Sequence, residues 1–406
     1  MKSRTPASLL RGLLTLLPTL TLLGIPEARA TDGYFDYGYG IKAKGIGGAG
    51  VAFPQDALAP ATNPAGAAFI EDRLDLGAAY FRPDRSASLG GTTYEGNETE
   101  GFIIPDLAIK KSITPDLAFD LAFYGNGGMN TDYAVPVPGF GTTPAGIDLS
   151  QLFAAPTLAY KLNADHALGV APIFAYQRFK ARGLQNFGVP NAGYDDAYGA
   201  GFRIGYTGRL APWLSVGATY QSRVYSTKFD NYKALFAEQG DFDTPSNFAV
   251  GFAVRPTDRI TFAFDVERIF YSEVNSVGND LSFARFAAGL GSDEGPGFGW
   301  RDVTAIKTGV AYTASDTLTL RVGYNHSSQP IRENQTYFNI LAPGVVQHHA
   351  TAGFTWKYSA AWELSGFYAH AFEAKVNGSG NAFGPATDAN LGMKQDTFGL
   401  SLGWLF

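Results

Sequence analysis

Histidine is the residue of this sequence with the widest chemical repertoire, and the chain has five: His166, His326, His348, His349 and His370. None of them stands in the spacing of a zinc-binding motif with a carboxylate partner. Adjacent residues on a strand point to opposite faces, so His348 and His349 cannot share a metal from one strand. A serine nucleophile needs a histidine base, and only His326 with Ser327 and Ser328 hints at such a pair. We therefore expect no metal site and no enzyme activity.

The glycine-rich run Gly45–Gly50 has the composition of a phosphate-binding loop but not its chemistry. It lacks the Gly-Lys-Ser/Thr ending that holds phosphate and metal, and no apolar strand precedes it. The chain contains no cysteine, which excludes disulfide bonds and thiolate catalysis. Its net charge of -6 disfavours binding to nucleic acid. No cofactor and no nucleic acid partner are therefore expected.

The first 30 residues have the form of a secretory signal peptide. Basic residues occupy the first third, and an apolar stretch over 13–25 follows them. Ala28-Arg29-Ala30 then fits the small-x-small cleavage rule, so the mature chain is predicted to start at Thr31. The apolar stretch is too short for a permanent membrane helix. The chain is therefore predicted to be exported, with residues 1–30 removed.

From residue 73 onward, apolar and polar residues alternate in segments of about ten residues. Apolar residues fall on the even positions of 214–221, 260–267, 317–324 and 351–358. A period of two predicts strands with one apolar and one polar face. A soluble β-sandwich alternates in the same way. Here, however, the apolar faces end in aromatic residues and the polar faces carry small and charged side chains, which favours a membrane barrel with a polar lumen.

The links between these segments alternate in length. Six short links lie at 114–116, 163–165, 211–212, 256–258, 314–316 and 359–361. Seven long links run approximately over 84–100, 127–148, 183–197, 229–246, 275–299, 330–347 and 376–393. Short periplasmic turns and long external loops are typical of outer-membrane barrels. We therefore predict an all-β fold, a 14-stranded antiparallel transmembrane β-barrel over residues 73–406 in the outer membrane of a Gram-negative cell.

The last strand ends on Phe406 after a regular alternation of apolar and small residues. A terminal aromatic residue on an amphipathic strand is similar to the signal that the barrel assembly machinery recognises. The alternative is an exposed C-terminal strand that happens to end in phenylalanine. Together with the signal peptide, Phe406 predicts a contact with that machinery during membrane insertion.

Charged residues fall on the polar faces of the predicted strands, at Arg203, Asp265, Glu267, Lys307 and Arg321. We interpret most of them as structural ion pairs inside the lumen. One or two of them, with Arg321 as the candidate, would suit the carboxylate of a fatty acid if the protein binds one.

Residues 31–72 do not alternate like the rest of the chain. Glycine crowds the first half of this segment and Pro54, Pro60 and Pro64 follow, so neither a strand nor a long helix is expected. Short helical turns fit near 41–50 and 57–68. A free disordered arm is one interpretation, but apolar residues throughout the segment favour a plug that packs inside the barrel.

Two features of the long links suggest a route for an apolar solute. Exposed loops rarely carry many apolar side chains without a use, and Phe140 and Phe236 lie in two such loops. These side chains either cap the barrel or capture a ligand, and the two roles are compatible. Asn126-Gly127-Gly128 tolerates a bulge, which would break strand pairing there, although an ordinary strand end or turn is the alternative.

Several motifs along the whole mature chain resemble the FadL/TodX family of outer-membrane transporters. Gly45–Gly50, Asp56-Ala57 and Asn63-Pro64-Ala65 look like the family's N-terminal hatch. Residues 124–131, 149–160 and 302–324 resemble its third strand, its fourth strand and its late barrel repeat. No single motif is decisive, but their order and spacing together are specific.

The resemblance implies a 14-stranded barrel with an N-terminal hatch that contains short helices. It implies uptake of long-chain fatty acids or monoaromatic hydrocarbons, in which loops capture the ligand, the barrel binds it, and a kinked third strand releases it sideways. The positions that match the hatch are Gly45, Gly47, Gly48, Asn63, Pro64 and Ala65. Those that match the kink are Asn126, Gly127 and Gly128.

The candidate ligand-binding residues come from loops and lumen: Phe140, Leu149, Leu152, Phe153, Phe236 and Arg321. The expected partners are a small hydrophobic ligand, outer-membrane lipid and lipopolysaccharide, and the protein is expected to be a monomer. Two alternatives stay open. A general diffusion porin for polar solutes needs an open channel, and a surface receptor or adhesin needs only the loops. The motifs do not distinguish fatty acids from aromatic hydrocarbons.

Overall fold

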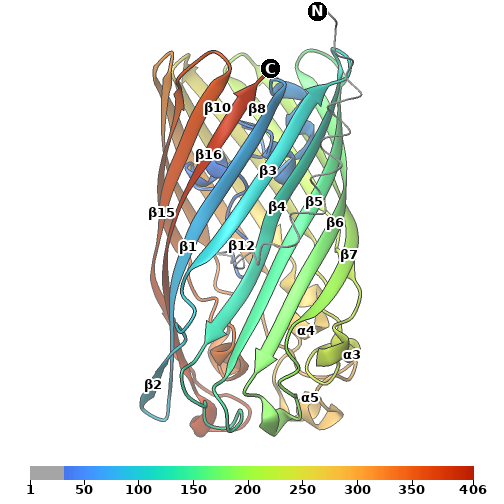
Figure 1. Ribbon diagram of the computed structural model, residues 1–406, viewed down its shortest axis with the longest axis vertical. Coiled ribbons are helices and arrows are strands. Elements are labelled where there is room, and N and C mark those ends of the chain that lie inside the picture. Colours follow the sequence, from blue (N-terminus) through green and yellow to red (C-terminus); the bar gives the residue numbers. More distant parts are fainter. Residues whose placement is uncertain (1–31) are drawn as a thin grey trace, which may run out of the picture.

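The computed structural model describes residues 32–406, so the predicted signal peptide and its cleavage site lie outside the described residues. Within this range, fourteen antiparallel strands close into a barrel (Figure 1). The barrel strands are β1 (Arg73–Leu89), β3 (Phe102–Ser112), β4 (Leu117–Asp132), β5 (Gly146–Lys161), β6 (His166–Arg182), β7 (Asp195–Ala211), β8 (Leu214–Gln221), β10 (Asn247–Thr257), β11 (Ile260–Ile269), β12 (Val303–Ser315), β13 (Leu318–Ser327), β14 (His348–Lys357), β15 (Trp362–Val376) and β16 (Asn390–Leu405).

Closure comes from the first and last strands, which pair from Arg73↔Leu405 to Ser88↔Asn390. Two short strands stand outside the set of fourteen. β2 (Thr92–Glu95) forms a hairpin with the end of β1, and β9 (Tyr225–Ser226) pairs with β7. The predicted third strand of the barrel is therefore β4.

The sequence alternation separates the inner and outer faces of each strand. On β16, Phe398 and Leu400 are 54% and 56% exposed, whereas Gly399 and Ser401 between and beside them are buried. Other strands expose apolar side chains in the same way, among them Leu168, Val170, Phe174, Phe202 and Ile204. A soluble β-sandwich would bury such residues. The outward apolar band therefore identifies a lipid-facing surface.

Short turns lie at the end of the barrel that carries the C-terminus, and long loops lie at the other end (Figure 1). β1 and β4, with their partners β16 and β5, extend further into the long links than their pattern predicted, because their pairing continues beyond the membrane-facing part. β1 stays paired with β16 to Ser88, and β4 stays paired with β5 to Asp132. The residues 126–128 thus lie within a strand, which excludes the alternative of a strand end or turn.

The long loops contain nine short helices in the part of the chain that the structure describes. These are η4 (Gln185–Phe187), η5 (Asp230–Tyr232), α3 (Ala237–Gly240), η6 (Tyr271–Glu273), α4 (Asn275–Gly278), α5 (Phe283–Ala288), η7 (Glu333–Gln335), η8 (Phe338–Ile340) and η9 (Pro385–Thr387). Among residues 32–406, no helix is long and apolar enough to cross a membrane.

Residues 32–72, the hatch, fill the lumen ahead of β1. Their short helices are α2 (Ile41–Lys44), η2 (Ala59–Ala61) and η3 (Pro64–Phe69), in the half of the barrel nearer the short turns (Figure 1). α2 packs against β14 and β15, and η3 packs against β5, β6 and β7. These positions agree with the helical turns expected near 41–50 and 57–68. The predicted fold class, a 14-stranded barrel with an N-terminal hatch, is confirmed.

Candidate functional site

The hatch backbone touches the barrel wall where the wall has glycine. A Cβ on Gly323 would lie 2.2 Å from the backbone nitrogen of Gly47, and one on Gly205 would lie 2.0 Å from Oδ1 of Asn63. Such distances leave no room for a side chain on the wall. The wall glycines whose added Cβ would lie within 3.0 Å of a hatch atom are Gly127, Gly169, Gly205, Gly217, Gly309, Gly323, Gly353 and Gly399.

The hatch glycines predicted from the sequence are Gly45, Gly47 and Gly48, and they lie where the hatch backbone makes close contacts. Gly47 and Gly48 have φ of +72° and +82°, which favours glycine, and Gly47 N donates to the Thr351 hydroxyl at 2.9 Å. A Cβ on Gly48 would lie 1.9 Å from the Tyr37 carbonyl oxygen. Gly45 packs on Gly353 of β14. Gly45 and Gly47 therefore allow the hatch chain to lie close to the wall, whereas Gly48 allows two segments of the hatch to approach each other.

Asn63 fixes the second half of the hatch. Its Oδ1 accepts a hydrogen bond from Ala65 N at 3.1 Å and caps η3, which begins with Pro64. Its Nδ2 donates to Val51 O at 2.7 Å within the hatch and to the Thr207 hydroxyl at 3.0 Å on β7. The side chain is buried and thus joins two hatch segments to the wall.

Ion pairs and hydrogen bonds between the hatch and the barrel wall complete the site where the hatch is held, which we call the seat. Oδ2 of Asp265 on β11 accepts from Gly50 N and Val51 N at 2.6 and 2.9 Å. Lys42 of the hatch pairs with Glu363 on β15. Arg321 donates from Nε to Gln55 Oε1 of the hatch at 2.7 Å. A carboxylate or cation buried without such partners would cost several kcal/mol, so these contacts specify one position of the hatch.

The remaining lumen charges predicted from the sequence take part in similar contacts. Lys307 lies 2.6 Å from Glu267 and 3.4 Å from Asp32 of the hatch. Arg203 Nη1 donates to the Pro60 carbonyl at 3.4 Å. Burial raises the pKa of the Asp32 carboxyl from 3.8 to about 6, against the opposing charge of Lys307.

The third barrel strand, β4, has a β-bulge at Asn126. The register of β4 against β5 shifts between Gly125 and Gly127, so Asn126 is an additional, bulged residue. Its amide donates to Gln151 at 3.0 Å, and its side-chain oxygen accepts from the Tyr39 hydroxyl of the hatch at 3.0 Å. The break predicted at residues 126–128 lies at this bulge.

Beyond the bulge, β4 separates from β3. Their pairing ends at Asp106↔Tyr124, and in the described strands Phe102–Pro105 of β3 pair only with β1. We call the region between Phe102–Pro105 and Gly125–Met129 the pairing gap. Main-chain hydrogen bonds to β4 resume near the loops, where Asp132 N donates to Gly96 O at 3.1 Å and Asp132 O accepts from Glu98 N at 3.0 Å.

A short stretch of the hatch, Tyr34–Asp36, lies along β4 at this gap, and we call it the strap. Phe35 forms an antiparallel bridge with Gly127. Gly128 N donates to Tyr34 O, and Asp36 N donates to Asn126 O, each at 3.0 Å. A Cβ on Gly127 would lie 1.9 Å from Tyr34 O, which explains the glycine. The strap thus supplies β4 with main-chain partners that β3 does not provide.

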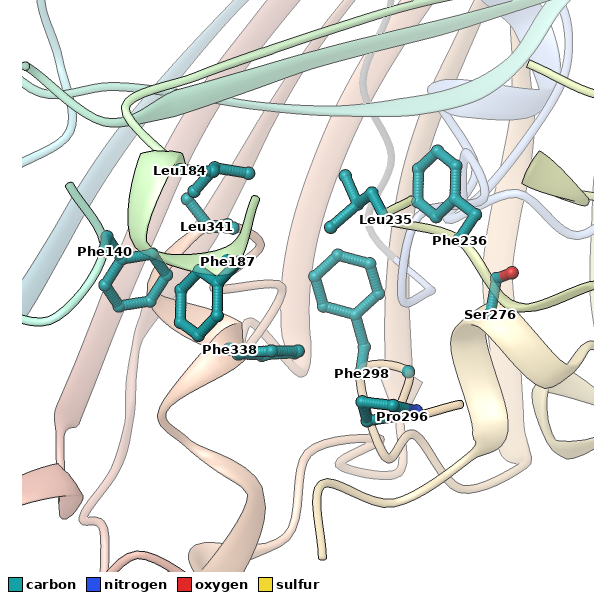
Figure 2. A pocket seen from close by; sticks show the side chains of 11 residues that line it. Phe140, Leu184, Phe187, Leu235, Phe236, Ser276, Pro296, Phe298, Phe338 and Leu341 are labelled. Carbon is teal, nitrogen blue, oxygen red and sulfur yellow. The ribbon is translucent and has the colours of Figure 1, made fainter. Parts of the chain in front are cut away.

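The long loops enclose an apolar pocket, which we call the loop pocket (Figure 2). Its lining side chains are contributed by five different loops. The lining residues are Phe140, Leu184, Phe187, Leu235, Phe236, Ser276, Pro296, Gly297, Phe298, Phe338 and Leu341. No charged side chain is among them. The only hydroxyl, of Ser276, donates to Asp241 O at 2.5 Å, so the pocket offers a ligand mainly apolar surface.

Apolar packing continues from the loop pocket to the pairing gap. Phe236 packs on Phe242 with ring centroids 4.8 Å apart, and Phe242 packs on Tyr34 at 5.9 Å. Tyr34 in turn contacts Phe35 of the strap at 5.4 Å. All four belong to one buried cluster, which also includes Phe102 and Ile104 of β3, Met129 of β4 and Phe81 of β1.

The six ligand-binding candidates divide between these regions. Phe140 and Phe236 line the loop pocket, and Leu149 is buried in the same cluster. Phe153 packs on Tyr124 at 5.9 Å beside the hatch, away from the loops. Leu152 is half-buried on the outward face, since its neighbours Gln151 and Phe153 face the lumen. Arg321 contacts the hatch and Thr355, not the loop pocket.

Most of the loop pocket was not predicted from the sequence. The residues missed are Leu184, Phe187, Ser276, Pro296, Gly297, Phe298, Phe338 and Leu341. Their signal is the large apolar residues in the long links 183–197, 275–299 and 330–347, which lie outside the two loops that contain Phe140 and Phe236. The strap was also missed, because nothing local in its sequence indicates strand pairing.

The histidines do not form a catalytic arrangement in the described residues. His326 stacks on His348 with centroids 4.5 Å apart on the outward face, whereas Ser327 is buried on the inward face. Ser327 and His326 are therefore separated by the wall, and the hydroxyl of Ser328 accepts a hydrogen bond from Thr304 N at 3.0 Å. Among residues 32–406, no three histidine or acidic side chains are placed to hold a metal ion.

A lipid-facing barrel with a seated N-terminal hatch defines the class of outer-membrane transport barrels. The model of the family described as "Outer membrane protein transport protein (OMPP1/FadL/TodX)" matches residues 40–403, and the chain belongs to this family. The predicted family and the predicted outer-membrane location are confirmed. The short turns accordingly face the periplasm and the long loops face outward. Among curated proteins, no sequence matches the chain.

Solved structures agree in fold. The P. putida toluene transporter TodX superposes with a TM-score of 0.70 at 16% identity, covering 91% of this chain and 99% of that chain. A Pseudomonas aeruginosa FadL homologue gives 0.69 at 15% identity, with 92% and 100% coverage. The Ralstonia pickettii toluene transporter TbuX gives 0.66 at 18% identity, with 91% and 99% coverage. At these identities the similarity establishes the fold.

Proposed function

We propose that this protein takes up small hydrophobic molecules across the outer membrane. The observation that carries the proposal is the continuous apolar cluster from the loop pocket to the pairing gap in β3–β4. A solute that follows this cluster leaves water once, in the loops, and does not have to be hydrated again before it reaches the bilayer. Lateral release through the wall is therefore favoured over passage along the barrel axis, where the hatch lies.

Capture is assigned to the loop pocket. Phenylalanine and leucine side chains suit an apolar guest, and no side chain there is charged. Burying a carboxylate without a partner costs several kcal/mol, so the loop pocket favours neutral hydrocarbons over ionised fatty acids. This agrees with the solved relatives that are described as toluene transporters and monoaromatic hydrocarbon channels. A fatty acid would have to place its carboxylate outside the pocket.

Release is assigned to the pairing gap. Interrupted pairing leaves part of the wall between Phe102–Pro105 and Gly125–Met129 without main-chain hydrogen bonds from strand to strand. The strap occupies this place at the inner side of β4. Displacing the strap would break only a few hydrogen bonds, whereas opening a fully paired strand interface would break a whole ladder.

The test is uptake by cells that lack other routes for these compounds. Radiolabelled toluene and oleate are supplied at growth-limiting concentration to cells with the intact protein and with an empty vector. We expect faster uptake of toluene, and at most a smaller gain for oleate. Equal uptake of both compounds with and without the protein would refute the proposal. A large steady conductance of the intact protein in planar bilayers would instead support a general porin.

A further inference from the structure

Tyr271 begins η6 in the long loop after β11, and its hydroxyl serves three backbone groups of the strap region. It accepts from Tyr34 N at 3.1 Å and from Phe35 N at 3.2 Å, and it donates to Asp32 O at 2.5 Å. The side chain is fully buried. Without this hydroxyl, two strap amides and one carbonyl would be buried with no replacement from water.

The chain around this hydroxyl is shaped to fit it. Asp32 N donates to Phe35 O at 2.9 Å, which closes a tight turn. Gly33 stands in the turn with φ of +82°, and a Cβ there would lie 2.6 Å from the Tyr271 hydroxyl oxygen. Any side chain at position 33 would therefore be strained and would push the tyrosine away.

The loop that carries Tyr271 also builds the loop pocket. Ser276, Pro296 and Phe298 of this loop line the pocket. Two residues after Phe298, Trp300 packs on Tyr271 with centroids 5.2 Å apart. The loop between β11 and β12 therefore contributes both to the wall of the loop pocket and to the contacts that hold the strap.

A hydrogen-bond bridge fixes the relation between the two. Asn339 of η8 donates from Nδ2 to Phe298 O at 2.7 Å and accepts from Trp300 Nε1 at 2.6 Å. A displacement of Phe298 would therefore reach the tryptophan that packs on Tyr271. Because protein interiors are close-packed, such a displacement is passed on and not absorbed.

We propose that Tyr271 is a positioning residue that latches the strap onto β4 and releases it when the loop pocket is filled. The inference rests on the proposed function, since it assumes that the ligand enters that pocket. Tyr271 does not have to touch the ligand. Its role is to hold the amides of Tyr34 and Phe35 while the pocket is empty.

The experiment measures amide hydrogen exchange of residues 32–36 by mass spectrometry on the full mature protein in detergent, with and without saturating toluene. Tyr271→Phe keeps the ring and removes the hydroxyl. Tyr232→Phe is the matched control, since the buried hydroxyl of Tyr232, in the loop after β8, accepts from Ala181 N of β6 at 3.0 Å and not from the strap. Closure of each barrel is verified by its heat-modifiable electrophoretic mobility.

In the intact protein and in the control, we expect toluene to accelerate exchange of the strap about tenfold or more. In Tyr271→Phe, exchange should be equally fast without toluene and should gain little from it. Slow exchange in Tyr271→Phe would overturn the latch. If this variant fails to fold, Gly33→Ala perturbs the same hydroxyl from the opposite side and should give the same fast exchange.

Uptake of labelled toluene by cells separates this inference from the proposed function. If toluene is transported but does not change strap exchange in the intact protein, the coupling is wrong and the proposed function stands. If neither toluene nor oleate is transported, the proposed function fails and the ligand step fails with it. Exchange in Tyr271→Phe without ligand still decides whether the hydroxyl holds the strap.

Discussion

The two halves of the lumen are filled in opposite ways. Near the periplasm, the hatch meets the wall through glycine contacts and through buried polar groups such as Asn63 and Asp265. Near the outside, phenylalanine, leucine and tyrosine from the loops pack on one another. Polar groups in a buried place demand specific partners, whereas apolar side chains tolerate repacking. The first half is therefore suited to a fixed seal, and the second to a pocket that adapts to a guest.

The strap Tyr34–Asp36 belongs to both halves. Its backbone pairs with β4, as a polar seal requires, while the rings of Tyr34 and Phe35 join the apolar cluster. A change that loosens either half of the lumen filling should therefore also loosen the strap at the pairing gap. The two kinds of change should differ in what they alter first, the seating of the hatch or the binding of a ligand. The following predictions, from the largest expected effect to the smallest, test this division.

Removal of the seal should have the largest effect. Deleting residues 31–72 behind the signal peptide should turn a nearly closed protein into a leaky channel, because the loops alone do not fill the periplasmic half of the lumen. Planar bilayer recordings should show a large steady conductance that the intact protein lacks. Equal conductance of the two proteins would mean that the hatch does not obstruct the lumen.

Crowding the seat should unseat the hatch without removing it. In Gly323→Ala the new Cβ would lie 2.2 Å from Gly47 N, a backbone atom that cannot rotate away. We expect a loss of about 3 kcal/mol or more in the seating free energy. Limited proteolysis of the hatch should be much faster than in the intact protein. Gly50→Ala is the control, since its nearest neighbour atom would be 3.7 Å away and its protection should be unchanged.

Acidity should tighten the seal. Burial raises the pKa of Asp56 to about 6, as it does for Asp32, and the neighbouring Asp75 adds to the shift at Asp56. A raised pKa in the seated state means that seating is favoured fully below about pH 3.8 and loses this contribution as the pH rises through about 6. At about 1.4 kcal/mol per unit, each group contributes up to about 3 kcal/mol.

Proteolysis of the hatch measured from pH 4.5 to pH 8 should thus accelerate with rising pH. Asp32→Asn and Asp56→Asn should flatten this dependence, because neither amide titrates. A profile that keeps its slope in both variants would show that other groups control the seating.

Changes in the adaptable half should have the smallest effect. Phe236→Ala removes an aromatic lining residue, which at about 1.5–3 kcal/mol lowers the affinity for toluene about tenfold to hundredfold. Concentration-dependent uptake by cells gives this value. Leu152→Ala is the control, since Leu152 faces outward, and it should leave uptake unchanged. Equal losses in the two variants would contradict the assignment of the loop pocket.

The barrel could be predicted from the sequence because its signal is local. Alternation with period two determines each strand and its outward face within about ten residues, and glycine at 127 and 128 marked the bulge at Asn126. The same parity corrects one ligand candidate. Leu152 and Phe153 are adjacent on one strand, so they cannot both face the lumen.

The loop pocket could be predicted only in part because its residues come together from separate loops. Phe140 and Phe236 were identified by the apolar character of their loops, but Phe187, Phe298 and Phe338 lie in links whose folding depends on one another. Arg321 shows a related limit. Parity placed it in the lumen, yet only the hatch position reveals that its partner there is Gln55.

The contact of Gly47 with Gly323 has a consequence for how the sequence can vary. A Cβ on Gly323 of β13 would lie 2.2 Å from Gly47 N of the hatch, and a Cβ on Gly47 would lie 2.7 Å from the backbone nitrogen of Tyr324, the next residue of β13. Neither position can be enlarged unless the chain opposite it retreats, and neighbouring contacts such as Asn63 with Gly205 prevent that retreat. Two distant stretches of the gene are thus constrained as one site, and a substitution in either is expected to require a compensating change in the other.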